Sequence, residues 1–208
     1  GDMSGFEGGG FSDFFQSIFG GMGQNPQGRG YSRASKGKNV EAELDISLED
    51  ALVSEKRTIT VNQKQIRFTV PAGIDDGQTI RIRGQGQPGV GGGPPGDLHI
   101  TFRFKKHSKF ERKGSNLYTQ VHVDLFTALL GGEVEIPTLQ GSLRMKIKAG
   151  TQNGSKLRLR DKGYPVYKKE DQFGHLIADI QVDLPTELSE DELKLIKEWQ
   201  ELKQKVRV

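Results

Sequence analysis

Residues 66–88 read IRFTVPAGIDDGQTIRIRGQGQP, and residues 143–165 read LRMKIKAGTQNGSKLRLRDKGYP. The two stretches match at an offset of 77 residues, and the register holds over about 50 positions. The matched pairs include Leu48 with Leu125, Arg67 with Arg144, Gly77 with Gly154, and Pro88 with Pro165. One further residue of offset pairs Gly96 with Gly174 and Leu98 with Leu176. A repeat of this length indicates two similar domains rather than a solenoid of short units.

Apolar and polar residues alternate along several short segments of each half, which is the pattern of half-buried β-strands. The first half alternates at Val40, Ala42, Leu44 and Ile46, at Ile59 and Val61, at Ile66, Phe68 and Val70, at Ile80 and Ile82, and at Leu98, Ile100, Phe102 and Phe104. Two breaks, at 47–52 and 124–130, predict short helices with Ser47 and Asp124 as N-caps. We therefore predict a mainly β chain with two tandem, homologous, mainly antiparallel β-sandwich domains, residues 39–114 and 115–186, each with a short helix.

Two dipeptides, Asp76-Gly77 and Asn153-Gly154, stand at equivalent positions between apolar runs. Both are typical of type I′ hairpin turns, in which the two central residues need positive φ. We expect each to join two neighbouring antiparallel strands. Small antiparallel sheets of this kind leave strand edges unpaired.

The N-terminal segment, residues 1–38, holds 11 of the 28 glycines and five of the 11 phenylalanines. Glycine loses the most backbone entropy on ordering, so the segment cannot stay folded alone. It is either a flexible linker or a transient helix over residues 12–19 that docks on an apolar surface. Its first 20 residues lack the basic start and apolar run of a signal peptide.

The C-terminal segment, residues 187–208, predicts one amphipathic helix of about four turns. Ser189 and Glu192 fit a capping box at its start. Its apolar positions are Leu195, Ile196, Trp199, Leu202 and Val206. The helix packs on its own second domain or pairs with the same helix of another chain. We favour pairing, and hence a homodimer, because the helix carries the only Trp and follows a short link that contains Pro185.

The sequence offers little for catalysis or cofactors. Cysteine is absent, which excludes disulfides and thiolate metal sites and fits the reducing cytoplasm. The run 84–89 matches G-x-G-x-x-G, but the glycines and prolines that follow cannot begin the helix that such a nucleotide site needs. The four histidines have no metal-ligand spacing, and no run of 18 apolar residues occurs. We expect no enzyme, no metal, no cofactor and no membrane span. The near-balanced charge, +3, argues only weakly for nucleic acid.

Several motifs together resemble the C-terminal part of DnaJ-type J-domain co-chaperones, in the class without a zinc-binding module. These are the Gly/Phe-rich region around 13–21, Ile46–Ala51, Val70–Gly77, Ile82–Gly86, Gly96–Leu98, His107–Phe110, Ala128–Gly132, Ile136–Leu139 and Gly174–Leu176. Residues 61–66 cross directly the place where the zinc-binding class carries its cysteine-rich insert. The family's J domain, which stimulates the partner ATPase, has no counterpart in this sequence.

The resemblance implies a cytoplasmic client-binding fragment that holds unfolded polypeptide and passes it to a DnaK-type chaperone. It places a peptide groove at Ala42, Leu44, Ile59, Val61 and Ile100, with Lys56 and Arg57 at a rim that meets acidic groups. The same residues would otherwise be ordinary sandwich core. The competing hypotheses are a nucleoid protein that binds curved DNA and a passive scaffold without client affinity.

Overall fold

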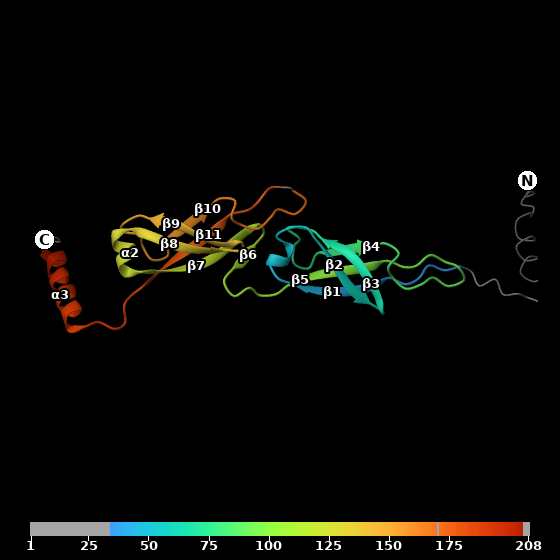
Figure 1. Ribbon diagram of the computed structural model, residues 1–208, viewed down its shortest axis with the longest axis horizontal. Coiled ribbons are helices and arrows are strands. Elements are labelled where there is room, and N and C mark those ends of the chain that lie inside the picture. The colour runs from blue at the N-terminus through green and yellow to red at the C-terminus, as the bar shows by residue number, and fades with distance from the viewer. Residues whose placement is uncertain (1–33, 170, 206–208) are drawn as a thin grey trace, which may run out of the picture.

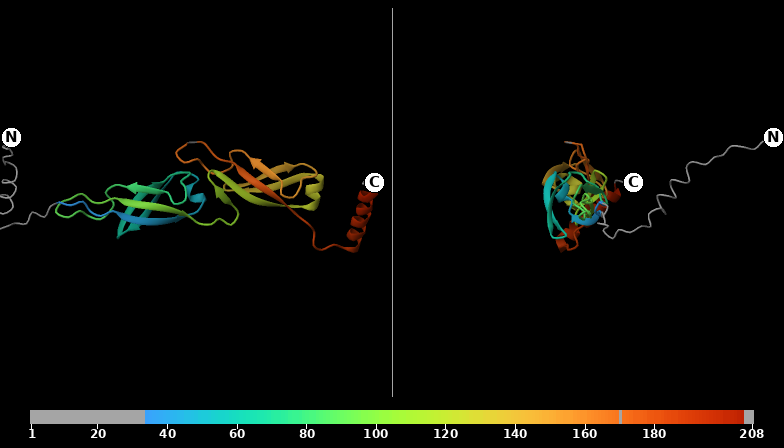
Figure 2. Two further views of the ribbon diagram at one scale, coloured as in Figure 1. Left: turned by 180° about the vertical axis from the view of Figure 1, so that it is seen from behind. Right: turned by 90° about the vertical axis from the view of Figure 1, so that its right-hand side faces the viewer.

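The computed structural model describes residues 34–169 and 171–205. These residues form an elongated molecule with two β-domains in a row and a C-terminal helix beyond the second (Figure 1). Seen along its long axis, the molecule is narrow (Figure 2). The order of the domains along the molecule therefore follows the order of the repeats in the sequence.

The first domain contains one three-stranded and one two-stranded sheet. Its elements are β1 (Val40–Ile46), η1 (Glu49–Ala51), β2 (Glu55–Val61), β3 (Lys64–Val70), β4 (Thr79–Ile82) and β5 (Leu98–Phe104). The larger sheet has the order β1-β5-β4, and β2 pairs with β3. Alternate residues of both sheets point inward, so the core holds Ile66, Phe68 and Val70 from one sheet and Leu98, Ile100 and Phe102 from the other.

The second domain repeats this plan. Its elements are β6 (Glu111–Lys113), β7 (Asn116–Asp124), α2 (Leu125–Leu130), β8 (Gly132–Thr138), β9 (Gly141–Ile147), β10 (Lys156–Leu159) and β11 (Leu176–Asp183). The sheets are β10-β11-β7-β6 and β8-β9. Each element except β6 has a first-domain counterpart at the offset found in the sequence. The prediction of two homologous, mainly β domains with one short helix each is thus confirmed.

The central strand pair of each domain is parallel. β1 runs parallel to β5, and β7 runs parallel to β11, while the other five pairings are antiparallel. The majority of pairings agrees with the prediction, but alternation carries no information on strand direction. The parallel pairs therefore had no signal in the sequence.

The hairpin prediction for Asp76-Gly77 and Asn153-Gly154 is wrong. The strands before and after each dipeptide lie in different sheets, and only the glycines have positive φ. Instead, the Asp76 carboxylate accepts the Phe104 N–H at 2.8 Å and the Asn153 side chain accepts the Val182 N–H at 2.9 Å. Each dipeptide thus connects a turn to the end of the central strand through one side-chain hydrogen bond.

The two-residue hairpin of the first domain lies elsewhere. Asn62 and Gln63 join β2 to β3 and have φ of 49° and 64°, as a type I′ turn requires. The strands are thus connected directly, as the class without a cysteine-rich insert would have them.

The predicted N-cap Asp124 is confirmed, but the N-cap of η1 is Leu48, one residue after the predicted Ser47. Ser47 Oγ still accepts the Asp50 N–H within η1, and the Asp124 carboxylate accepts the Thr127 N–H in α2. The C-terminal helix, α3 (Glu190–Lys205), begins with the predicted capping box, in which Ser189 N–H donates to Glu192 at 2.8 Å. Among its described residues none is buried, so α3 does not pack on its own domain. Val206 lies outside the described residues.

The two domains meet around Tyr164, which the second domain contributes. Its side chain is fully buried, and the Arg112 guanidinium lies 4.0 Å from the centre of its ring. Arg112 also donates to the Ile74 carbonyl oxygen at 2.7 Å. Next to it, Gly73 packs so closely that a Cβ there would lie 2.4 Å from the Pro165 carbonyl oxygen. We refer to this contact as the domain joint.

Candidate functional site

The predicted groove residues come from two strands with free edges. β1 is an edge strand of its sheet and β2 belongs to a two-stranded sheet, so each has one side without a strand partner among the described residues. Ala42 and Leu44 in β1, and Ile59 and Val61 in β2, are half-buried and pack against the core. They therefore combine apolar surface with unpaired backbone groups.

Ile100 does not fit the prediction. It lies in the central strand β5 beside Ala42, and its side chain is 0% exposed. A residue in this position has neighbouring strands on both sides, so it belongs to the core and cannot line an open groove. Alternation identified the inward face correctly but could not separate the central strand from the edge strand.

The second domain provides an internal comparison, because three of the four groove positions are closed there, whereas the counterpart of Val61, Thr138, is half-buried as Val61 is. The counterparts of Ala42, Leu44, Arg57 and Ile59 are Thr119, Val121, Val134 and Ile136, which are 5%, 4%, 7% and 0% exposed. β7 lies against β8, whereas β1 and β2 are farther apart. The open apolar strip on β1 and β2 is thus a property of the first domain alone.

The two predicted rim residues point to opposite faces of β2. Arg57 shares the face of Ile59 and Val61, while Lys56 alternates to the exposed outer face. The Arg57 guanidinium pairs with the Asp50 carboxylate of η1 and lies 3.7 Å from Glu55. Only Arg57 therefore stands beside the apolar strip.

The pKa of Asp50 is lowered at this rim. Burial alone would raise it, but hydrogen bonds from the Ser47 N–H and from Arg57 outweigh that effect. The carboxylate consequently stays ionised and holds Arg57 against the first turn of η1. The basic rim is partly neutralised by this pair.

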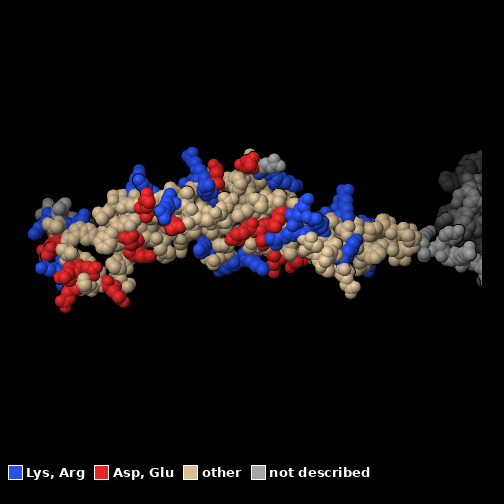
Figure 3. All heavy atoms as spheres, in the orientation of Figure 1, with Lys and Arg blue, Asp and Glu red and all other residues tan. Residues whose placement is uncertain are grey.

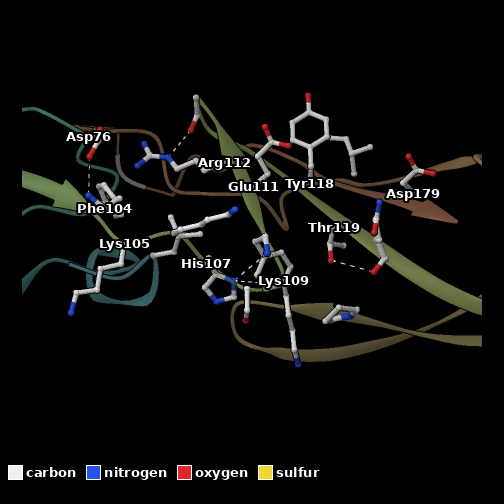
Figure 4. Close-up of a pocket in the computed structure, with 18 of the residues that line it drawn as sticks. Asp76, Phe104, Lys105, His107, Lys109, Glu111, Arg112, Tyr118, Thr119 and Asp179 are labelled. Atoms are coloured by element: carbon white, nitrogen blue, oxygen red, sulfur yellow. Dashed lines mark hydrogen bonds between the residues drawn. The ribbon is translucent and has the colours of Figure 1, made fainter. Parts of the chain in front are cut away.

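A larger hollow, which the sequence did not predict, lies beside the domain joint. This cleft has a volume of about 1210 Å³ and is lined by the link 104–112, by Asp75 and Asp76, and by the outer face of β7, β10 and β11. Figure 4 shows Lys105, Lys109, Glu111 and Asp179 around it. His107 Nδ1 accepts the Lys109 N–H at 3.0 Å, which leaves Nε2 as the donor to Glu49.

The charges around the molecule are mixed. Lys and Arg alternate with Asp and Glu along the face in Figure 3, without one continuous basic surface there. Within the described part of the chain no group of three or more His, Asp or Glu side chains has the arrangement of a metal site. No described helix is long and apolar enough to cross a membrane.

Comparison with known proteins places this geometry in a family. The model of the DnaJ C terminal domain matches residues 40–185. Chaperone protein DnaJ of Parageobacillus thermoglucosidasius is 47% identical over 140 residues, which are 67% of this chain and 37% of that protein. The corresponding protein of Caldicellulosiruptor bescii is 42% identical over 140 residues, 67% of this chain and 36% of its own length.

A relative with another name matches over a longer stretch. The curved DNA-binding protein of Coxiella burnetii is 37% identical over 178 residues, 79% of this chain and 57% of that protein. The chain thus spans between 36% and 57% of the length of these relatives. With its duplicated β-domains and the match over 40–185, the chain belongs to the DnaJ C-terminal domain family.

Proposed function

We propose that this chain binds unfolded or non-native polypeptide on the first domain and delivers it to a DnaK-type ATPase chaperone. The binding surface is the apolar strip, which consists of Ala42 and Leu44 on β1 and Ile59 and Val61 on β2. An extended client segment would add to a free strand edge through backbone hydrogen bonds. Its alternate side chains would cover the apolar strip, a mode that suits variable sequences.

The observation that carries this proposal is the difference between the two domains. Both descend from one repeat, yet Ile59 is half-exposed while its counterpart Ile136 is 0% exposed. A core position that opens in only one copy of a duplicated fold leaves apolar surface without a partner among the residues that the structure describes. A polypeptide client is the partner that fits an apolar strip between free strand edges.

A single groove of this kind binds a client peptide weakly. Full burial of one apolar side chain yields about 1.5–3 kcal/mol. Association costs roughly 4–15 kcal/mol. Three or four such contacts barely exceed that cost, so a single groove binds clients with micromolar or weaker affinity.

We propose that α3 joins two chains into a homodimer, which places two weak sites on one clamp. Its apolar residues are exposed in the single chain: Leu195 is 64%, Trp199 43% and Leu202 61% exposed. Two tethered sites raise the effective concentration of the second and gain about 10²–10⁴ in avidity. Dimerisation therefore compensates for the weakness of each groove.

Arg57 supports delivery to the partner chaperone. It stands beside the apolar strip, and its side chain remains 31% exposed while it pairs with Asp50. An acidic segment of the DnaK-type partner would compete with Asp50 for this guanidinium. Such a segment and the client would then share one surface, so that binding of the partner favours client release.

The test is a map of the backbone amides that a model unfolded peptide perturbs in solution. The proposal predicts perturbed amides along β1 and β2 and unperturbed amides along their counterparts β7 and β8. Perturbations confined to the second domain, or absent from both, would contradict it.

A second candidate function is binding of curved DNA, as the name of the Coxiella burnetii relative suggests. The mixed charges in Figure 3 favour it less than the apolar strip favours peptide. A duplex affinity that falls steeply with salt concentration would support this function. The absence of binding at low salt would remove it.

A further inference from the structure

The loop between β4 and β5, residues 83–97, holds the segment that leads into β1, residues 34–39 (Figure 1). Ser35 and Val90 exchange two backbone hydrogen bonds of 3.0 Å, as neighbouring antiparallel strands do. We call the loop the clasp and the segment that it holds the entry segment. The contact between them fixes the place at which the N-terminal part of the chain joins the first domain.

Glycines let the backbones of the clasp and the entry segment approach closely. The Gly37 N–H donates to the Pro94 carbonyl oxygen at 2.9 Å. A Cβ on Gly37 would lie 1.8 Å from the Gln87 carbonyl oxygen, and a Cβ on Gly93 would lie 2.1 Å from the Ser35 carbonyl oxygen. No other residue fits at these two positions without a shift of the backbone. The glycines of the loop therefore serve a tight contact.

The second domain holds its own entry in the same way. The Tyr164 N–H, in the loop between β10 and β11, donates to the Ser115 carbonyl oxygen at 2.7 Å. A Cβ on Gly174 would lie 1.9 Å from that oxygen. In the second domain the loop thus fixes the link from the first domain. In the first domain the clasp fixes the segment through which residues 1–33 are attached.

The clasp attaches the N-terminal segment close to the apolar strip. Ala42 follows Ser35 by seven residues, which span at most about 25 Å. Residues 11–19, FSDFFQSIF, end 16 positions before Ser35, and a stretch of that length spans at most about 55 Å. We call residues 11–19 the Phe run, which lies outside the described residues. The connection is therefore long enough for the Phe run to reach the strip of its own chain.

The composition of the Phe run matches that of the strip. The strip offers half-buried apolar side chains that have no partner among the described residues, and Arg57 stands beside them with 31% of its side chain exposed. The Phe run has one charged residue, the acid Asp13, and five large apolar ones: Phe11, Phe14, Phe15, Ile18 and Phe19. Apolar side chains can cover the strip while the carboxylate of Asp13 meets the guanidinium of Arg57.

We propose that the Phe run occupies the apolar strip of its own chain and competes there with client polypeptide. The inference rests on the proposed binding of clients at the strip. A segment on a short tether acts at an effective concentration in the millimolar range. The strip binds each apolar segment with micromolar or weaker affinity, so the tethered run occupies it for much of the time. A client must displace the run, and its apparent affinity falls by the fraction of strips that are free.

The first test measures the dissociation constant of a labelled model unfolded peptide by fluorescence anisotropy with the full chain. A variant that combines Phe14→Ser, Phe15→Ser and Ile18→Ser should bind the peptide about two- to tenfold more tightly, as expected if the run covers half to nine tenths of the strips. The matched control combines Gln16→Ser and Gln24→Ser, which change polar residues of the same segment. The control should bind as wild type does.

The outcomes separate this inference from the proposed function. If the triple variant binds the peptide as wild type does, or more weakly, the competition is wrong and client binding at the strip stands. Ile59→Asp, added to the triple variant, should remove the gain in affinity. If the gain survives this change, the peptide binds elsewhere and both proposals are wrong.

The second test locates the Phe run without altering its apolar residues. The chain has no cysteine, so Ser17→Cys provides a unique site for a spin label. The label should broaden backbone amide signals along β1 and β2 and leave those along β7 and β8 sharp. No broadening, or equal broadening in both domains, would overturn the proposal. In a mixture of spin-labelled chains with isotope-labelled chains that lack the spin label, broadening of the same amides would show that a second copy supplies the run, which would also overturn it.

Discussion

The hydroxyl of Tyr164 in the second domain donates a 2.9 Å hydrogen bond to the backbone carbonyl oxygen of Leu48 in the first. Burial raises the pKa of this phenol well above its ordinary value, so it remains a donor throughout the physiological range. The ring also meets Phe104 edge to face, with 6.2 Å between the ring centres. One side chain therefore supplies both polar and apolar contacts of the domain joint.

Truncation of this side chain should destabilise the protein. Tyr164→Ala should cost about 3–5 kcal/mol, the range for large aromatic residues in cores. Tyr164→Phe should cost about 1–3 kcal/mol, because it leaves the Leu48 carbonyl oxygen without its donor. Urea unfolding measures the loss of unfolding free energy in both variants. Tyr118→Phe, on the half-exposed face of β7, is the control and should stay within about 0.5 kcal/mol of wild type. A Tyr164→Ala chain as stable as wild type would show that the joint does not form.

The duplicated glycines allow the joint to be measured separately from backbone strain. Gly73 and Gly150 have φ of 72° and 79°, so an alanine at either site costs about 1–2 kcal/mol for the left-handed conformation. Gly73→Ala also pushes a Cβ into the Pro165 backbone, and such overpacking adds about 1–3 kcal/mol. The melting temperature of Gly73→Ala should thus be lower than that of Gly150→Ala. Equal melting temperatures would contradict the close contact.

Ile59→Asp should abolish suppression of client aggregation and weaken binding of a model unfolded peptide at least about tenfold. The carboxylate would remove apolar surface from the strip and carry charge into it. Thr60→Asp, on the exposed outer face of the same strand, is the matched control and should bind as wild type does. Loss of the fold in Ile59→Asp would mean that Ile59 is core, and unchanged binding would place the client elsewhere.

The rim pair makes a prediction for acid stability. The pKa of Asp50 is lowered in the folded chain, so the unfolded chain takes up a proton first as the pH falls. The stability that Asp50 contributes is therefore present at pH 7 and lost as the pH falls below the ordinary aspartate value of 3.8. The free energies of unfolding of wild type and Asp50→Asn should differ at pH 7, and the difference should shrink as the pH falls below 3.8. Asp45→Asn, exposed on β1, is the control. A difference that grows in acid would refute the assignment.

The architecture could be predicted from the sequence because duplication and alternation report it directly. Matching Arg67 with Arg144 fixed the repeat, and the strands and capped helices then followed at the same offset in both halves. Strand direction could not be predicted, since alternation is the same in parallel and antiparallel strands. The Asn62-Gln63 hairpin was missed because neither residue is the glycine that usually marks such a turn.

The candidate site was predicted only in part. The sequence identified the inward face of β1 and β2, but exposure depends on which strand is central, and that separates Ile100 from Ala42. It also placed Lys56 at the rim, although alternation puts it on the outer face of β2. The joint had no local signal, because Tyr164 and Leu48 are 116 positions apart and belong to different domains.

The parallel pairing of β1 with β5 has a mechanical consequence. The chain enters the first domain through β1 and leaves it after β5, and the seven residue pairs between the two strands run in the same direction. Tension that pulls the ends of the domain apart thus slides one strand along the other and loads their hydrogen bonds together instead of unzipping them singly. β7 and β11 repeat this geometry in the second domain. The parallel pair thus gives each domain resistance to a pulling force along its length.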